Sequence, residues 1–166
     1  MVTLGSYRGP LQTAVVRMKH ANEQGLATAV GILLADKARR ELIDHVPDAV
    51  VPMPMHWMRR IMRGINTPEV LAETMAYQLS IPCVPHILTV CKRTRKQSLL
   101  PPTERRKNLH HALAIRPDCD LSGCHVLLID DIVTTGASAN EAVRNLRQAG
   151  ASQVTVAAVA RALPPS

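Results

Sequence analysis

The sequence predicts an α/β fold with a mainly parallel central sheet flanked by helices. Two observations predict it: short aliphatic runs typical of buried strands, and stretches with helical apolar spacing that alternate with those runs. The length of 166 residues suits one domain with a substantial core. We therefore expect a single domain over residues 1–166, with an N-terminal helical segment, residues 1–45, packed on it.

The predicted helices have apolar side chains at intervals of three and four residues, and their ends carry proline or glycine. In the helix that starts near residue 67, Thr67 is expected to be the N-cap, with Pro68 in the first position. The first predicted helix begins at Gly9-Pro10 and ends before Gly25, and the second begins at Leu26. The third runs from Thr67 to about Leu79, and the fourth contains Ala139–Leu146 and ends at Gly150.

The predicted strands are short and rich in aliphatic residues. After the first strand, prolines 52 and 54 should prevent further ladder donation and start a stiff loop. A basic, proline-interrupted stretch, Lys92–Lys107, is expected to be an exposed loop. The strands cover Val46–Val51, Pro85–Val90, Ala112–Ile115, Val126–Ile129 and Val154–Val159.

Two adjacent acids, Asp130 and Asp131, follow the most apolar of these strands, so they should lie at the carboxyl edge of the sheet. The hydroxyl and glycine residues Thr134–Ser138 come next and directly precede a helix, an arrangement that binds phosphate. Carboxylates suit sugar hydroxyls or a bound Mg²⁺, so the pattern predicts a sugar-phosphate site. The alternative is that the acids only start a loop and that Thr135 or Ser138 only caps the helix.

The charge balance favours a negatively charged ligand or partner. Lys and Arg number 20 against 13 Asp and Glu, a net charge of +7. Only Trp57, Tyr7 and Tyr77 are aromatic, which argues against a base-stacking surface. The longest apolar runs have seven residues and the start has no apolar signal segment, so we expect a cytoplasmic protein without a membrane span.

Residues 126–138 closely resemble the phosphoribosyl-pyrophosphate (PRPP) motif of type I phosphoribosyltransferases, with Ser138 where threonine is commoner. Further segments upstream make nearly the whole chain resemble the competence protein F (ComF) family. These segments are Val51–His56, Arg59-Arg60, Arg63–Asn66, Arg93–Gln97 and Arg105–Asn108. The resemblance implies a type I phosphoribosyltransferase-like fold.

The resemblance also implies roles for individual residues. Asp130 and Asp131 would hold the ribose hydroxyls, directly or through Mg²⁺ with or without intervening water. The 5′-phosphate would lie on Thr134, Thr135, Gly136, Ala137 and Ser138. The pyrophosphate would meet Pro52, Met53, Pro54, Met55 and His56, and a mobile lid would carry the catalytic cations Arg93, Arg95 and Lys96.

Three departures from the family pattern stand out. Ile65 replaces an aromatic residue and Thr67 replaces a glutamine, so the ligand of that loop need not be the family's usual one. Members usually begin with a four-cysteine zinc ribbon, whereas this sequence begins almost at Tyr7–Pro10, the segment that follows it. Either the ribbon was lost or the given start lies too late.

The sequence thus predicts an Mg²⁺-dependent, PRPP-using phosphoribosyltransferase-like protein in which a nucleophile displaces pyrophosphate at the anomeric carbon. The acceptor and the oligomeric state stay open. The alternative is a non-catalytic accessory protein of DNA uptake whose basic loops bind single-stranded DNA. A phosphoacceptor receiver domain would also have an acid pair after a strand, but it gives the loop Lys92–Lys107 no purpose.

Overall fold

A computed structural model describes residues 1–55, 65–90 and 113–162. Their central sheet has the strand order β1-β6-β5-β2, and all three pairs are parallel. The predicted α/β class with a parallel sheet is confirmed. The strands are β1 (Val2–Ser6), β6 (Gln153–Arg161), β5 (His125–Val133) and β2 (Ala49–Pro52).

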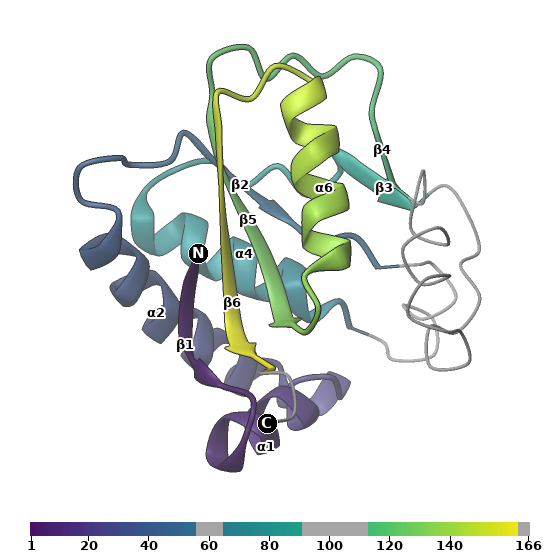
Figure 1. The fold of residues 1–166 in the computed structure, drawn as a ribbon. Coiled ribbons are helices and arrows are strands. Elements are labelled where there is room, and N and C mark those ends of the chain that lie inside the picture. Colours follow the sequence, from purple (N-terminus) through teal and green to yellow (C-terminus); the bar gives the residue numbers. More distant parts are fainter. Residues whose placement is uncertain (56–64, 91–112, 163–166) are drawn as a thin grey trace.

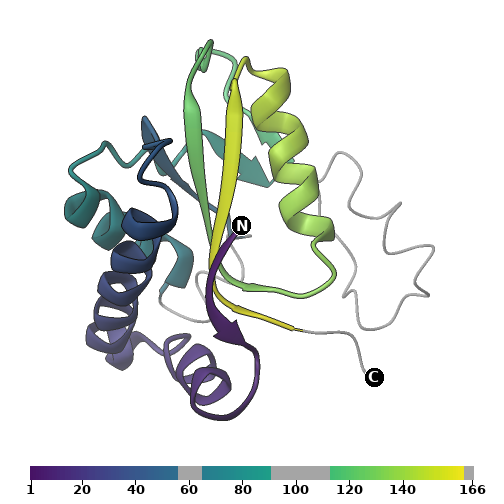
Figure 2. The ribbon, with the colours of Figure 1, turned by 60° about the vertical axis from the view of Figure 1, so that its left-hand side comes forward.

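Helices cover both faces of this sheet. Helices α1, α2 and α4 lie on one face and α6 on the other (Figure 2). Because the strands are parallel, β5 and β6 end at the same edge, and Figure 1 shows α1 near that edge. The helices are α1 (Gly9–Arg17), α2 (Gln24–Glu41), α4 (Thr67–Leu79) and α6 (Ala137–Gln148), with a 3₁₀ turn η1 (Ala21–Glu23) before α2.

The apolar run at the start of β5 fills two cores. Leu127 and Ile129 belong to the cluster that contains α2 and α4 side chains, whereas Val126 and Leu128 belong to the cluster that contains α6 side chains. Successive side chains of a strand point to opposite faces, so a strand covered on both faces needs four apolar residues in a row. This explains why the run is unbroken.

Strand β1 was not predicted. Residues 1–45 were expected to be helical, but Val2–Ser6 pairs with β6, for example Val2 with Ala157 and Thr3 with Ala158. Five residues with a glycine among them carry little strand signal. The pairing with a distant strand stabilises this conformation.

The predicted end of the first core strand was wrong by one residue. Pro52 is the last residue of β2, opposite Ile129, and the N–H of Met53 then donates to the Ile129 carbonyl at 2.7 Å. Proline lacks a donor but still occupies a ladder position, so donation resumes with the next residue.

The predicted strands around residues 85–90 and 112–115 do not join the central sheet. Instead, β3 (Leu88–Val90) and β4 (Leu113–Ile115) form a separate antiparallel pair. Leu88 and Leu113 pack with the cluster beneath α6. The expected loop Lys92–Lys107 lies outside the described residues.

Helix α2 packs closely against α4 through Gly31. A Cβ atom at this position would lie 2.9 Å from Cβ of Thr74 and 3.0 Å from its Cγ2. Threonine Cβ is fixed to the backbone, so the helices would have to separate.

In the described ranges, no helix is long and apolar enough to traverse a bilayer.

Gly31→Ala should therefore show none of the stabilisation that alanine usually gives a helix, and its free energy of unfolding should be equal to or below the parent's. Overpacking costs ~1–3 kcal/mol, which outweighs or cancels the ~1 kcal/mol that alanine gains in a helix. Gly25→Ala is the matched control, because nothing lies within 4 Å of a Cβ there and the same propensity gain should stabilise the protein. Urea denaturation of the three proteins gives both values. A Gly31→Ala variant as stable as Gly25→Ala would contradict the close packing.

Candidate functional site

The acid pair lies within β5, not after it. Asp130 is opposite Ala158 and Ile132 is opposite Ala160, so the strand continues to Val133. The expectation that the strand ends at Ile129 was therefore wrong. The neighbouring β6 places alanines, Ala158 and Ala160, opposite Asp130 and Ile132, so the ladder continues past the first acid.

The two carboxylates repel one another in a partly buried place. The N–H of Asp131 donates to Oδ1 of Asp130 at 2.8 Å. Burial, followed by the charge of Asp131, raises the pKa of Asp130 well above its ordinary value. The ionised pair is thus unfavourable in the free protein, and a cation or hydrogen-bond donors would relieve it.

Lys19 supplies a cation that sequence analysis missed. Its Nζ lies 3.1 Å from Oδ2 of Asp131, and the two side chains are 27% and 14% exposed. The backbone beside it is fixed, because the buried carbonyl of Met18 accepts a hydrogen bond from Oγ1 of Thr67 at 3.0 Å. Thr67 is the first residue of α4 and not its N-cap, which is Asn66. No local pattern links Lys19 to Asp131, since they are far apart in the sequence.

The loop between β5 and α6 ends in an open glycine. Gly136 has φ 76° and ψ 0° and is the N-cap of α6. A Cβ there would approach only Nδ2 of Asn140, at 3.9 Å, so a ligand can come close to the backbone. Neither Thr135 nor Ser138 occupies the N-cap position, although Oγ1 of Thr135 accepts from the N–H of Ala137 at 3.4 Å.

The start of α6 fits an anion. The first-turn N–H groups of an α-helix have no carbonyl partner within the helix, and the helix dipole makes this end positive. Thr134 and Thr135 are exposed, and Gly136, Ala137 and Ser138 are half-buried. These five residues therefore present hydroxyls and backbone N–H groups next to the acid pair.

The residues after β2 come to the same edge. The bond from Met53 to Ile129 places the backbone of Met53 beside the residue that precedes Asp130. Met53 is buried, and Pro54 and Met55 are half-buried. The remaining predicted site residues, His56, Arg93, Arg95 and Lys96, lie outside the described residues.

The acid pair has the donor chemistry that Mg²⁺ uses. Within the described part of the chain, no three His, Cys, Asp or Glu side chains gather at one point. Mg²⁺ commonly takes one or two carboxylates and completes its octahedron with waters and substrate phosphates. Two carboxylates with a raised pKa at Asp130 fit such a partly hydrated ion.

Comparisons with known proteins agree with this geometry. Residues 69–163 match the family model of the phosphoribosyl transferase domain. Adenine phosphoribosyltransferase from Saccharomyces cerevisiae superimposes with a TM-score of 0.52 at 18% identity, covering 87% of this chain and 72% of that one. The fold is thus that of the type I phosphoribosyltransferases.

Two curated relatives match along nearly the whole chain. Competence protein F of Haemophilus influenzae is 32% identical over 168 residues, and DNA utilization protein YhgH of Salmonella typhimurium is 30% identical over 166. Each alignment covers 98% of this chain and 72% of the relative. The chain belongs to the competence protein F family, within the phosphoribosyl transferase domain family, which confirms the resemblance seen in the sequence.

Asp130→Asn should raise the melting temperature at neutral pH. Because the folded protein raises the pKa of Asp130, it holds this proton more tightly than the unfolded chain does. Stability is therefore lost as pH rises from the unfolded pKa, about 4, towards the folded one. Asparagine carries no charge and escapes this loss, so the difference between variant and parent should shrink towards pH 4.

Melting curves at several pH values test this expectation. Asp36→Asn is the matched control, since Asp36 is on the surface of α2 and pairs with Arg39 at 3.1 Å. Its effect should be small across the same pH range. A parent protein that melts above Asp130→Asn at neutral pH would contradict the unfavourable charge at Asp130.

Proposed function

We propose that this protein is a cytoplasmic, Mg²⁺-dependent, PRPP-binding phosphoribosyltransferase-like protein, built as one domain over residues 1–166. The observation that carries the proposal is the placement of the acid pair and the loop Thr134–Ser138 side by side at the carboxyl edge of a parallel sheet. Ligands of open α/β sheets bind at this edge. A sugar phosphate carries hydroxyls that suit the acid pair and a phosphate that suits the loop Thr134–Ser138.

In the proposed complex, the ribose hydroxyls donate hydrogen bonds to Asp130 and Asp131. These donors would offset the burial and the repulsion that raise the pKa of Asp130. The 5′-phosphate accepts hydrogen bonds from the first N–H groups of α6 and from the hydroxyls of Thr134, Thr135 and Ser138. The ion pair with Lys19 keeps Asp131 in one orientation.

The proposed reaction breaks the bond between the anomeric carbon and a pyrophosphate oxygen, and a nucleophile forms the new bond at that carbon. The leaving pyrophosphate takes the electron pair of the broken bond. Bound Mg²⁺ would supply positive charge to the pyrophosphate oxygens. The chain's own residues position the ribose, and Pro52–His56 with Arg93, Arg95 and Lys96 are proposed to surround the leaving group.

A second candidate function is binding of single-stranded DNA as an accessory protein of DNA uptake. The net charge of +7 and the names of two relatives, competence protein F and DNA utilization protein, favour it. Phosphate contacts alone support sequence-independent binding. The two functions predict different effects when the acid pair is replaced and when the basic residues Arg93, Arg95 and Lys96 are replaced.

Replacing both acids, Asp130→Asn with Asp131→Asn, should weaken PRPP binding at least about tenfold, because each hydrogen bond to a charged group contributes ~1.5–3 kcal/mol. Isothermal titration with and without Mg²⁺ measures the loss and also tests the metal dependence. The matched control is Asp36→Asn with Asp118→Asn, which removes two charges from the exposed surface and should bind like the parent. Equal PRPP affinity in the parent and the acid-pair variant would remove Asp130 and Asp131 from the site.

Replacing Arg93, Arg95 and Lys96 together by glutamine separates the enzyme from the DNA-binding protein. In an enzyme, these cations should contact pyrophosphate most strongly as its charge develops, so turnover should fall far more than PRPP affinity. In a DNA-binding protein, DNA affinity should fall, and the slope of log K against log salt should decrease by up to about 0.7 for each phosphate that the variant no longer neutralises.

Pyrophosphate release across candidate acceptors and DNA titrations at several salt concentrations measure the two effects. The triple variant Lys37→Gln, Arg39→Gln, Arg40→Gln on α2 removes the same charge at a distance from the site and serves as the control. Unchanged turnover in the first variant would contradict the catalytic role, and an unchanged salt slope would contradict the DNA role of this segment.

A further inference from the structure

Lys19 belongs to a turn whose backbone is fixed by short-range bonds. The N–H of Lys19 donates to the Val16 carbonyl at 3.3 Å. The N–H of Glu23 donates to the His20 carbonyl at 3.0 Å, and the carboxylate of Glu23 accepts from the Arg17 guanidinium at 2.7 Å. The turn between α1 and α2 therefore holds the Cα atom of Lys19 in place.

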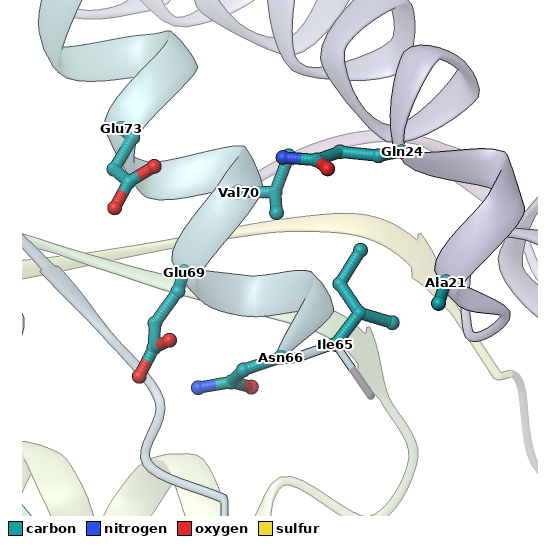
Figure 3. Close-up of a pocket in the computed structure, with 7 residues that line it drawn as sticks. All are labelled: Ala21, Gln24, Ile65, Asn66, Glu69, Val70 and Glu73. Atoms are coloured by element: carbon teal, nitrogen blue, oxygen red, sulfur yellow. The ribbon is translucent and has the colours of Figure 1, made fainter. Parts of the chain in front are cut away.

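Helix α4 anchors this turn directly beside Lys19. Oγ1 of Thr67 donates to the carbonyl of Met18 at 3.0 Å, and the two residues are only 1% and 0% exposed. Next to this contact the two segments separate around a cavity of about 280 Å³, where Ala21 and Ile65 lie on opposite walls (Figure 3). Because the bond from Thr67 is buried, it fixes the backbone from which the Lys19 side chain extends to the acid pair.

The Lys19 ammonium occupies one oxygen of the acid pair. Its Nζ lies 3.1 Å from Oδ2 of Asp131, while the N–H of Asp131 donates to Oδ1 of Asp130. The ammonium carries a full positive charge, so it cancels part of the negative charge of the pair. The contact is partly buried, and salt therefore screens it less than it screens a surface ion pair. Lys19 thus lowers the attraction of the pair for a further cation.

A divalent cation and Lys19 cannot share this oxygen. Mg²⁺ binds carboxylate oxygens at about 2.0–2.1 Å, so an ion on Oδ2 of Asp131 would lie no more than about 5 Å from Nζ of Lys19. Two positive charges at this separation repel, so the ammonium would have to leave and give up its own contact. Sugar hydroxyls are uncharged and can approach the pair while Lys19 stays. The ion pair therefore discriminates against a metal ion but not against a hydroxyl.

We propose that Lys19 is a positioning residue that keeps divalent cations off the acid pair and reserves Asp131 for the hydroxyls of a sugar. Lys19 acts through Asp131 and needs no contact with the ligand. A sugar phosphate, which brings oxygen ligands of its own, is then required before Mg²⁺ is held at the site. The inference rests on the proposed function for the sugar phosphate, whereas the competition between Lys19 and a cation does not depend on it.

The test is a titration of the 166-residue chain with Mn²⁺, without any phosphate compound, in which electron paramagnetic resonance measures the free ion. Mn²⁺ prefers the same oxygen ligands as Mg²⁺. Lys19→Met removes the charge and should bind Mn²⁺ about five- to twentyfold more tightly than the parent, as expected for the loss of a competing charged hydrogen bond. An affinity equal to or below the parent's would overturn the proposal, because a merely structural role predicts no gain.

Matched variants separate the position of the charge from its loss. Lys37→Met makes the same substitution at a lysine that pairs with Glu41 at 3.6 Å on α2, and it should leave the Mn²⁺ affinity unchanged. Lys19→Arg keeps the charge and should keep the weak Mn²⁺ binding of the parent. Lys19→Gln repeats the test with a polar side chain, in case Lys19→Met folds poorly. A Lys19→Arg variant that binds Mn²⁺ as tightly as Lys19→Met would overturn the electrostatic argument.

A double-mutant cycle shows whether Lys19 acts through Asp131. In an Asp131→Asn background, Lys19→Met should give no gain in Mn²⁺ affinity, because the oxygen for which the two cations compete is no longer charged. A gain as large as in the parent background would overturn the assignment of Lys19 to Asp131.

Ribose 5-phosphate, titrated in the presence of EDTA, tests the effect on the sugar ligand. Lys19→Met should weaken its binding about two- to fivefold, because Asp131 loses its fixed orientation and its uncompensated charge repels the phosphate. Opposite effects on Mn²⁺ and ribose 5-phosphate support the proposal, and an unchanged ribose 5-phosphate affinity would overturn the reservation of Asp131. If neither protein binds ribose 5-phosphate while Mn²⁺ binding increases, the proposed function fails and the competition at Asp131 is supported.

Discussion

The central constraint on this structure is the placement of two adjacent carboxylates in a strand that is paired on both sides. Strand β5 lies between β6 and β2, and it keeps its pairing with β6 through Asp130. The backbone cannot separate the two charges, so burial and repulsion raise the pKa of Asp130. The surrounding elements compensate for this charge: Lys19 binds Asp131, and the positive end of α6 lies next to the pair.

The N-terminal segment contributes to the site through its packing. Gly31 allows α2 to lie against α4, and Thr67 at the start of α4 holds the backbone at Met18. The next residue, Lys19, reaches the acid pair from there. Changes in the contact between α2 and α4 should therefore alter the site even though neither helix carries its acids.

The sequence by itself determined the α/β class, most of the helices, and the succession of apolar run, acid pair, hydroxyl-glycine loop and helix. These features depend on local patterns: four consecutive apolar residues before Asp130, and small polar residues before α6. Only the tertiary structure decided the pairing of β1 with β6, the ladder position of Pro52 and the ion pair of Lys19 with Asp131. Each of these depends on residues that lie far apart in the chain, and no local spacing records such relations.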